Sequence, residues 1–182
     1  MNPGGHGQGA GKVVPEPVRV ADLVSDSGAL RFRLRLLDRE GRAGPPAATA
    51  GRILAAASLE YLDRRDGGHW PVVELGAVHL APEAARALCA GLGDAIRGGS
   101  PGLAWRSGDP AALGLQAGVS EGTPGAWQVE VGLDLAGFLA GVAGTPPGPG
   151  SELALFRFPV ARPALVAFAS ALEAELRELA VP

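Results

Sequence analysis

The sequence predicts an α+β protein in which mostly antiparallel sheets pack against two amphipathic helices. Several segments alternate apolar and polar residues, which is the period of a half-buried strand. Two other segments have the 3.6-residue period of a helix that is buried on one side. The stretches 73–97 and 153–177 match in pattern at an offset of 80 residues, and each is a strand that leads into one of these helices. We therefore expect an internal pseudo-duplication of two similar halves, about 18–99 and 100–182, in a single domain.

Composition describes a globular, mildly acidic chain. Of the 182 residues, 47% are hydrophobic and the formal net charge is −3, so no general basic field attracts nucleic acid or an anionic membrane. The single cysteine leaves no internal disulfide framework. No segment approaches the ~20 apolar residues of a membrane-spanning helix. Abundant Ala, Gly and Pro with almost no lysine are typical of a GC-rich bacterial genome, and we expect a cytoplasmic protein with no membrane partner.

Residues 1–17 have no periodic apolar pattern and are predicted to form a flexible tail ahead of a domain over 18–182. GHGQGAGK at 5–12 is similar to a phosphate-binding loop, which needs G-x-x-x-x-G-K-[ST] between a strand and a helix. His6 stands at the first glycine position, and Val13, which has no hydroxyl group for magnesium, follows the lysine. We therefore expect no nucleotide site and no cofactor here.

The clearest predicted strand spans residues 29–37, in which apolar side chains and arginines alternate. The arginines are Arg31, Arg33 and Arg35, and the apolar residues of the other face are Leu30, Phe32, Leu34 and Leu36. An arginine row with a spacing of about 7 Å could contact anions or nucleic acid. Because the chain is acidic overall, we favour the other interpretation, in which the arginines pair with Asp and Glu on neighbouring strands.

Residues 47–63 fit two interpretations. Their alanine content suits a helix, whereas the alternation of Leu59 and Tyr61 with polar neighbours suits a strand. We favour a strand over 52–62, because the equivalent part of the second half, 127–135, alternates clearly.

A turn and a long strand complete the sheet of the first half. DRRDGG at 63–68 has the composition of a hairpin turn. The strand over 69–80 contains Pro71, which has no N–H for a ladder, so this strand starts at a sheet edge or beyond Pro71.

The first predicted helix begins near Ala81 and ends at Gly98 and Gly99. Pro82 suits the first helical position, and glycine ends helices in the left-handed conformation. The apolar stripe comprises Ala85, Leu88, Cys89, Leu92 and Ile96.

Three residues of this helix need separate interpretation. Cys89 lies on the apolar stripe and is interpreted as a small core residue rather than a nucleophile. Gly91 and Gly93 weaken the helix by about 1 kcal/mol each relative to alanine, which favours a role in close backbone packing.

The second half repeats the plan. Strands are predicted over 103–107, 112–120, 127–135 and 152–160, with a rigid prolyl loop at 144–150. The strand over 152–160 is apolar on both sides, so we expect it at the centre of its sheet.

The second helix is predicted from about Arg162, with Pro163 in its first turn. Its apolar stripe comprises Leu165, Phe168, Leu172, Leu176 and Leu179. Its solvent side is expected to carry Glu173, Glu175 and Glu178.

The sequence carries no recognisable catalytic or metal-binding constellation. His6, His69 and His79 lack metal-ligand spacing, and there is no G-x-S-x-G nucleophile motif. We therefore name no catalytic, cofactor-binding or metal-binding residue.

The repeated plan of several strands and then a helix resembles the Whirly-type single-strand nucleic-acid-binding fold. It is equally similar to small bacterial two-layer domains of the immunity-protein kind. Both resemblances concern the pattern over about residues 29–179, without a shared motif, so no functional residue is carried across.

Three function classes follow from these observations. We expect a non-enzymatic interaction protein that binds itself, as a homodimer, or one protein partner. The alternative is a single-strand nucleic-acid-binding protein that uses the row Arg31, Arg33 and Arg35 with a stacking tryptophan. Trp105 is the candidate, and Trp70 and Trp127 are the other tryptophans that could stack. All three occupy apolar strand positions typical of a core. A further alternative is an enzyme whose site is built from loops.

Overall fold

In the part of the chain that a computed structural model describes, two four-stranded antiparallel sheets pack with two helices, which confirms the α+β class. The structure describes residues 21–39, 51–63, 65, 67–98, 102–107, 113–119, 126–134 and 153–179. The tail predicted at 1–17 and the prolyl loop at 144–150 lie outside these ranges. Neither helix in the described ranges is long and apolar enough to cross a membrane.

Each sheet keeps its strands in chain order, and a helix follows its last strand. Sheet A comprises β1 (Ala21–Val24), β2 (Leu30–Arg39), β3 (Ile53–Leu62) and β4 (His69–Leu80), followed by α1 (Pro82–Arg97). Sheet B comprises β5 (Gly102–Arg106), β6 (Leu113–Val119), β7 (Ala126–Asp134) and β8 (Leu153–Ala161), followed by α3 (Arg162–Glu178). The N-caps of the two helices, Ala81 and Ala161, lie 80 positions apart, and both have an extended backbone.

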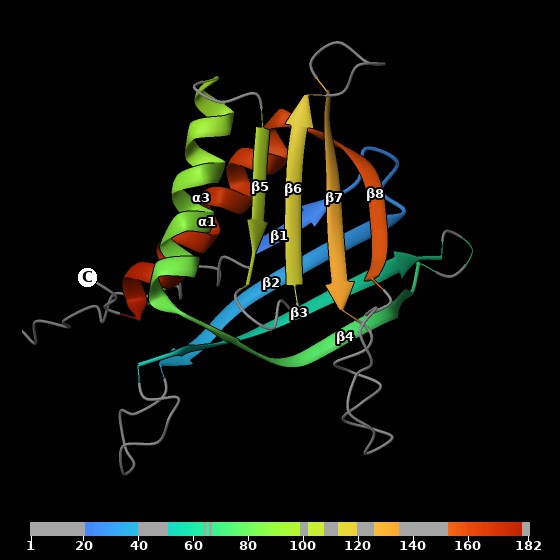
Figure 1. Ribbon diagram of the computed structural model, residues 1–182. Helices are drawn as coiled ribbons and strands as arrows, with labels where there is room; N and C mark the ends of the chain where they lie inside the picture. Colours follow the sequence, from blue (N-terminus) through green and yellow to red (C-terminus); the bar gives the residue numbers. More distant parts are fainter. Residues whose placement is uncertain are drawn as a thin grey trace, which may run out of the picture.

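The strands of sheet B run across those of sheet A, and both helices lie along one side of the crossed sheets (Figure 1). Each helix packs against the other half: α1 contacts β5 of sheet B, and α3 contacts β1 and β2 of sheet A. The two helices also pack against each other. The two halves therefore share one core.

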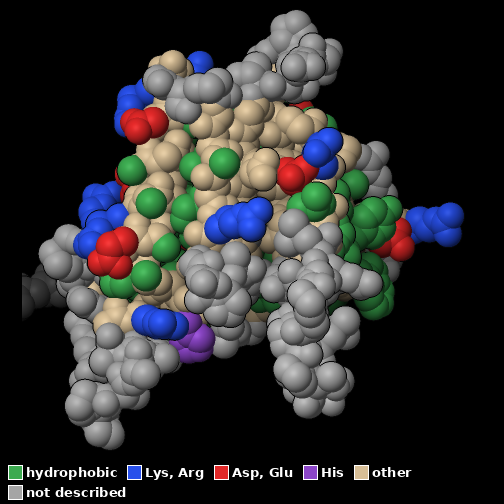
Figure 2. All heavy atoms as spheres, in the orientation of Figure 1, with side chains coloured by type: hydrophobic (Ala, Val, Ile, Leu, Met, Phe, Trp, Pro, Cys, Tyr) green, Lys and Arg blue, Asp and Glu red, His purple; other side chains and the backbone are tan. Residues whose placement is uncertain are grey.

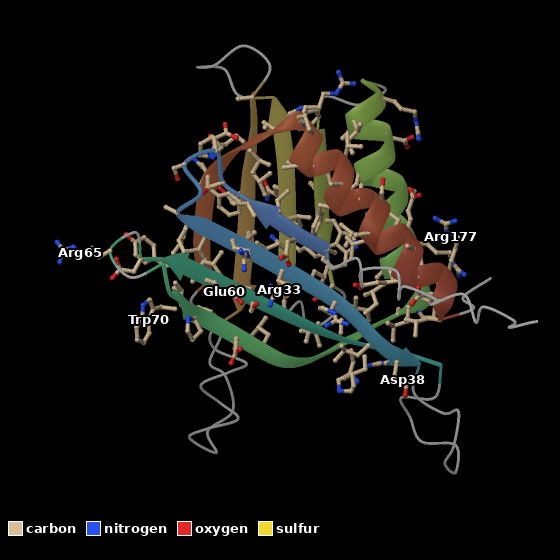
Figure 3. All side chains as sticks on the ribbon, turned by 180° about the vertical axis from the view of Figure 1, so that it is seen from behind. Arg33, Asp38, Glu60, Arg65, Trp70 and Arg177 are labelled. Carbon is tan, nitrogen blue, oxygen red and sulfur yellow. The ribbon has the colours of Figure 1, made fainter. Side chains whose placement is uncertain are left out.

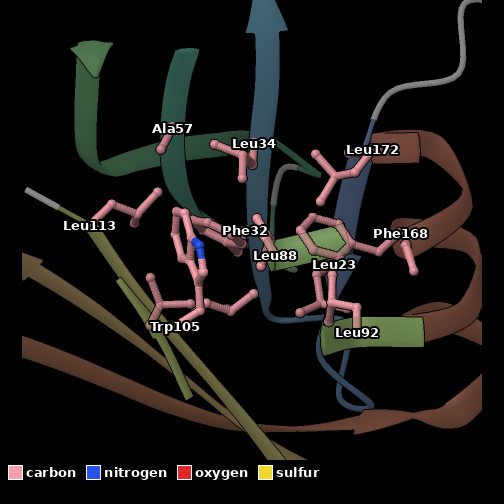
Figure 4. Close-up of a cluster of buried hydrophobic side chains, with 14 of the residues drawn as sticks. Leu23, Phe32, Leu34, Ala57, Leu88, Leu92, Trp105, Leu113, Phe168 and Leu172 are labelled. Carbon is pink, nitrogen blue, oxygen red and sulfur yellow. The ribbon is translucent and has the colours of Figure 1, made fainter. Parts of the chain in front are cut away.

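Alternation along the strands turns one face of each sheet into this core. On β2, Phe32 and Leu34 are buried, whereas the three arginines that alternate with them stay partly exposed. The ring of Phe32 packs against Phe168 of α3 with centroids 6.1 Å apart, and Leu172 of α3 is fully buried. Figure 4 shows these side chains with Trp105 in the same cluster.

The structure confirms the predicted strand within 47–63 and both predicted helices. β3 covers most of the favoured range 52–62, and β4, which contains Pro71, lies at a sheet edge as expected. The helix α1 ends at Gly98, whose φ of 80° is left-handed.

The two helix glycines contact side chains rather than another backbone. A Cβ atom on Gly91 would lie 2.5 Å from Leu103 Cδ1, the end of a side chain on β5, so a larger residue here requires Leu103 to move. At Gly93, the neighbouring atoms belong to the flexible side chain of Arg97. Close backbone packing, the predicted role of these glycines, is therefore not observed at either position.

Three expectations are wrong. The strand over 152–160, β8, lies at the edge of sheet B rather than at its centre, and its Leu155 is 53% exposed. Glu175 is buried rather than on the solvent side of α3. Trp70 is 59% exposed rather than in the core. In each case, the burial of the side chain depends on which distant segment packs against it. The spacing of apolar residues within one strand or helix carries no information about that segment.

Removal of the Leu172 side chain tests the shared core. We expect Leu172→Ala to lower the free energy of unfolding by about 2–5 kcal/mol, because a fully buried leucine loses its transfer energy and leaves a cavity. Urea denaturation measures this change. The matched control is Val166→Ala on the same helix, where the side chain is 40% exposed and the loss should stay under about 1 kcal/mol. Equal losses in both variants would contradict the packing of α3 described above.

Candidate functional surface

The arginine row of β2 lies on the outer face of sheet A, away from sheet B, and is neutralised by carboxylates. Arg33 Nε donates to Asp22 Oδ1 at 2.8 Å, and its Nη1 donates to Glu60 Oε1 at 3.4 Å. Arg31 forms ion pairs with the same two carboxylates, at 3.8 Å and 3.5 Å. Asp22 belongs to β1 and Glu60 to β3, so register places one acid on each side of the row. Arg33 and Glu60 lie together in the middle of this face in Figure 3.

The third arginine of the row faces a buried carboxylate. Arg35 Nε lies 3.8 Å from Glu175 Oε1, too far for a hydrogen bond. The other carboxylate oxygen of Glu175 accepts the backbone N–H of Leu36 at 2.7 Å. Burial raises the pKa of Glu175, while the Leu36 hydrogen bond and Arg35 oppose the rise. Glu175 therefore ties α3 to β2.

For Arg31 and Arg33, these contacts match the interpretation in which the arginines pair with acids on neighbouring strands, whereas the acid that faces Arg35 lies on α3. The hydrogen bond to Asp22 raises the pKa of Arg33, so its charge is firmly retained within the network. Phosphate binding to Arg33 would have to displace carboxylates that already accept hydrogen bonds from its guanidinium group.

Trp105 lies apart from the arginine row. It is 7% exposed on β5, and its Nε1–H donates to the Ala84 carbonyl of α1 at 2.7 Å. This bond satisfies the indole inside the core, so the ring offers no stacking surface. Trp127 on β7 is also buried. The structure therefore brings no tryptophan of the core together with Arg31, Arg33 and Arg35.

Large apolar side chains are exposed instead at the β3–β4 hairpin. Tyr61 is 48% exposed and Trp70 59%, and we call these two residues the hairpin patch. Val72, which is 46% exposed, is the extra residue of a bulge next to Val73. Because Val73 pairs with the core residue Leu59, alternation places Val72 on the opposite face of the sheet. Antiparallel register places Tyr61 directly opposite Trp70, at a separation of about 5 Å between Cβ atoms. Figure 2 shows hydrophobic side chains gathered at the right-hand side, over this end of the sheet, and Figure 3 shows Trp70 and Arg65 at the hairpin end.

The hairpin patch continues a row of the core. Leu30 of β2 pairs with Tyr61, so Leu30, Tyr61 and Trp70 form one line across three strands. The next line inward contains Phe32 and Leu59, which are both 1% exposed. The apolar face of sheet A therefore runs from the core out to solvent.

Sequence reasoning missed this patch, although one signal was present. Pro71 had indicated a sheet edge, and an edge strand has fewer neighbours to bury the tryptophan next to that proline.

In the described ranges, no group of three or more His, Cys, Asp or Glu residues could hold a metal ion. Burial raises the pKa of the Cys89 thiol to about 11, so the thiolate is scarce near neutral pH. His79 is exposed on β4.

Comparison with known proteins adds no family. The sequence matches no protein-family description and no curated protein. Among solved structures, the chain is similar to "Crystal structures of trypanosoma bruciei MRP1/MRP2", with 12% identity, a TM-score of 0.40 and coverage of 81% of this chain and 83% of the other. A similarity this distant carries no argument about fold or function.

Substitution of Glu175 tests its buried position. The folded-state pKa of Glu175 lies above the ordinary value of 4.5, so protonation favours the folded state. The carboxyl group therefore contributes most to the free energy of unfolding at pH values below 4.5. We expect Glu175→Gln, which stays neutral, to match the wild type near pH 4 and to become more stable than it as pH rises through the folded-state pKa. Urea denaturation across this pH range measures the difference.

Glu175→Ala is the companion variant. It leaves the Leu36 N–H without an acceptor and should lose about 1–3 kcal/mol at every pH. A Glu175→Gln protein that is less stable than the wild type at pH 7 would show that the charge pair with Arg35 outweighs the cost of burial.

Proposed function

We propose that this chain is a non-enzymatic protein-interaction domain that binds its partner through the hairpin patch. The supporting observation is the exposure of Tyr61 and Trp70, which the strand register places opposite each other, on a protein that buries its other tryptophans. Contiguous exposed apolar surface is characteristic of binding sites. Tryptophan and tyrosine are also the residues that most often dominate the binding energy of protein interfaces.

The surroundings of the patch favour a protein partner over a nucleic acid. A single-strand binder combines stacking aromatic rings with a positively charged groove along the backbone. Tyr61 and Trp70 supply rings, but Arg31 and Arg33 lie on the opposite face of sheet A and are paired with acids. The net charge of −3 adds no attraction. A protein of the bacterial cytoplasm remains the partner that we propose.

Position-specific photocrosslinking tests the proposed function. A photoreactive phenylalanine analogue replaces Trp70 in cells that naturally make the protein, and Val166, exposed on α3, carries the same analogue as a control. We expect a discrete protein adduct from position 70 and none from position 166, with mass spectrometry to identify the adduct. Irradiation that gives no adduct at position 70, or equal adducts at both positions, would count against the hairpin patch as a binding site.

Nucleic-acid binding is tested separately by fluorescence anisotropy with labelled single-stranded DNA and RNA. We expect no micromolar binding at salt concentrations of about 50 mM, where phosphate contacts are strongest. Micromolar binding that weakens steeply towards about 200 mM salt, and that is lost in Arg33→Glu, would instead support the arginine face.

A further inference from the structure

We draw no further inference here: the strongest candidate, the exposed apolar surface of Tyr61 and Trp70 at the β3–β4 hairpin with the adjoining outer edge of β4, belongs to the surface already described, and nothing in the described part of the chain shows which molecule covers it.

Discussion

The structure depends on the need to cover strand edges and apolar sheet faces at the same time. Each sheet has four strands, too few to close into a barrel, so its outer strands stay available for contact. Two of the four outer strands are covered because each helix packs against the opposite half of the chain. α1 packs beside β5 of the second half, and α3 packs beside β1 of the first half. The hydrogen bond from the Leu36 N–H to Glu175 fastens α3 at the same place. Packing and edge protection therefore come from the same two elements.

Much of the fold was predictable because its signals are local. Alternation defined β2, and the extended Ala81 followed by Pro82 marked the start of α1. Gly98, with its left-handed backbone, marked the end of that helix. The pairing of the β2 arginines with acids was also predictable in kind, since an acidic chain rarely leaves three adjacent guanidinium groups unpaired.

The remaining features depend on contacts between distant segments. Apolar residues on both sides of β8 suggested a central strand, but strand order is set by the whole sheet, and β8 lies at an edge. Glu175 follows the helical spacing of a solvent residue, yet β2 lies over it. Trp70 has the alternation of a core residue, but sheet A extends past the elements that cover the rest of its inner face. The candidate surface was therefore the least predictable part of the molecule.

The packing of each helix against the opposite half of the chain also affects how the protein can fold during synthesis. β1 ends at Val24, whereas α3, which packs beside it, begins at Arg162. The first sheet can form its hairpins as soon as they emerge, because antiparallel neighbours are close in sequence. Its β1 edge nevertheless stays uncovered until α3, which follows the whole of the second sheet in the chain, has been synthesised. A nascent chain thus has a long interval with an open strand edge, during which it is vulnerable to misassembly or dependent on chaperones.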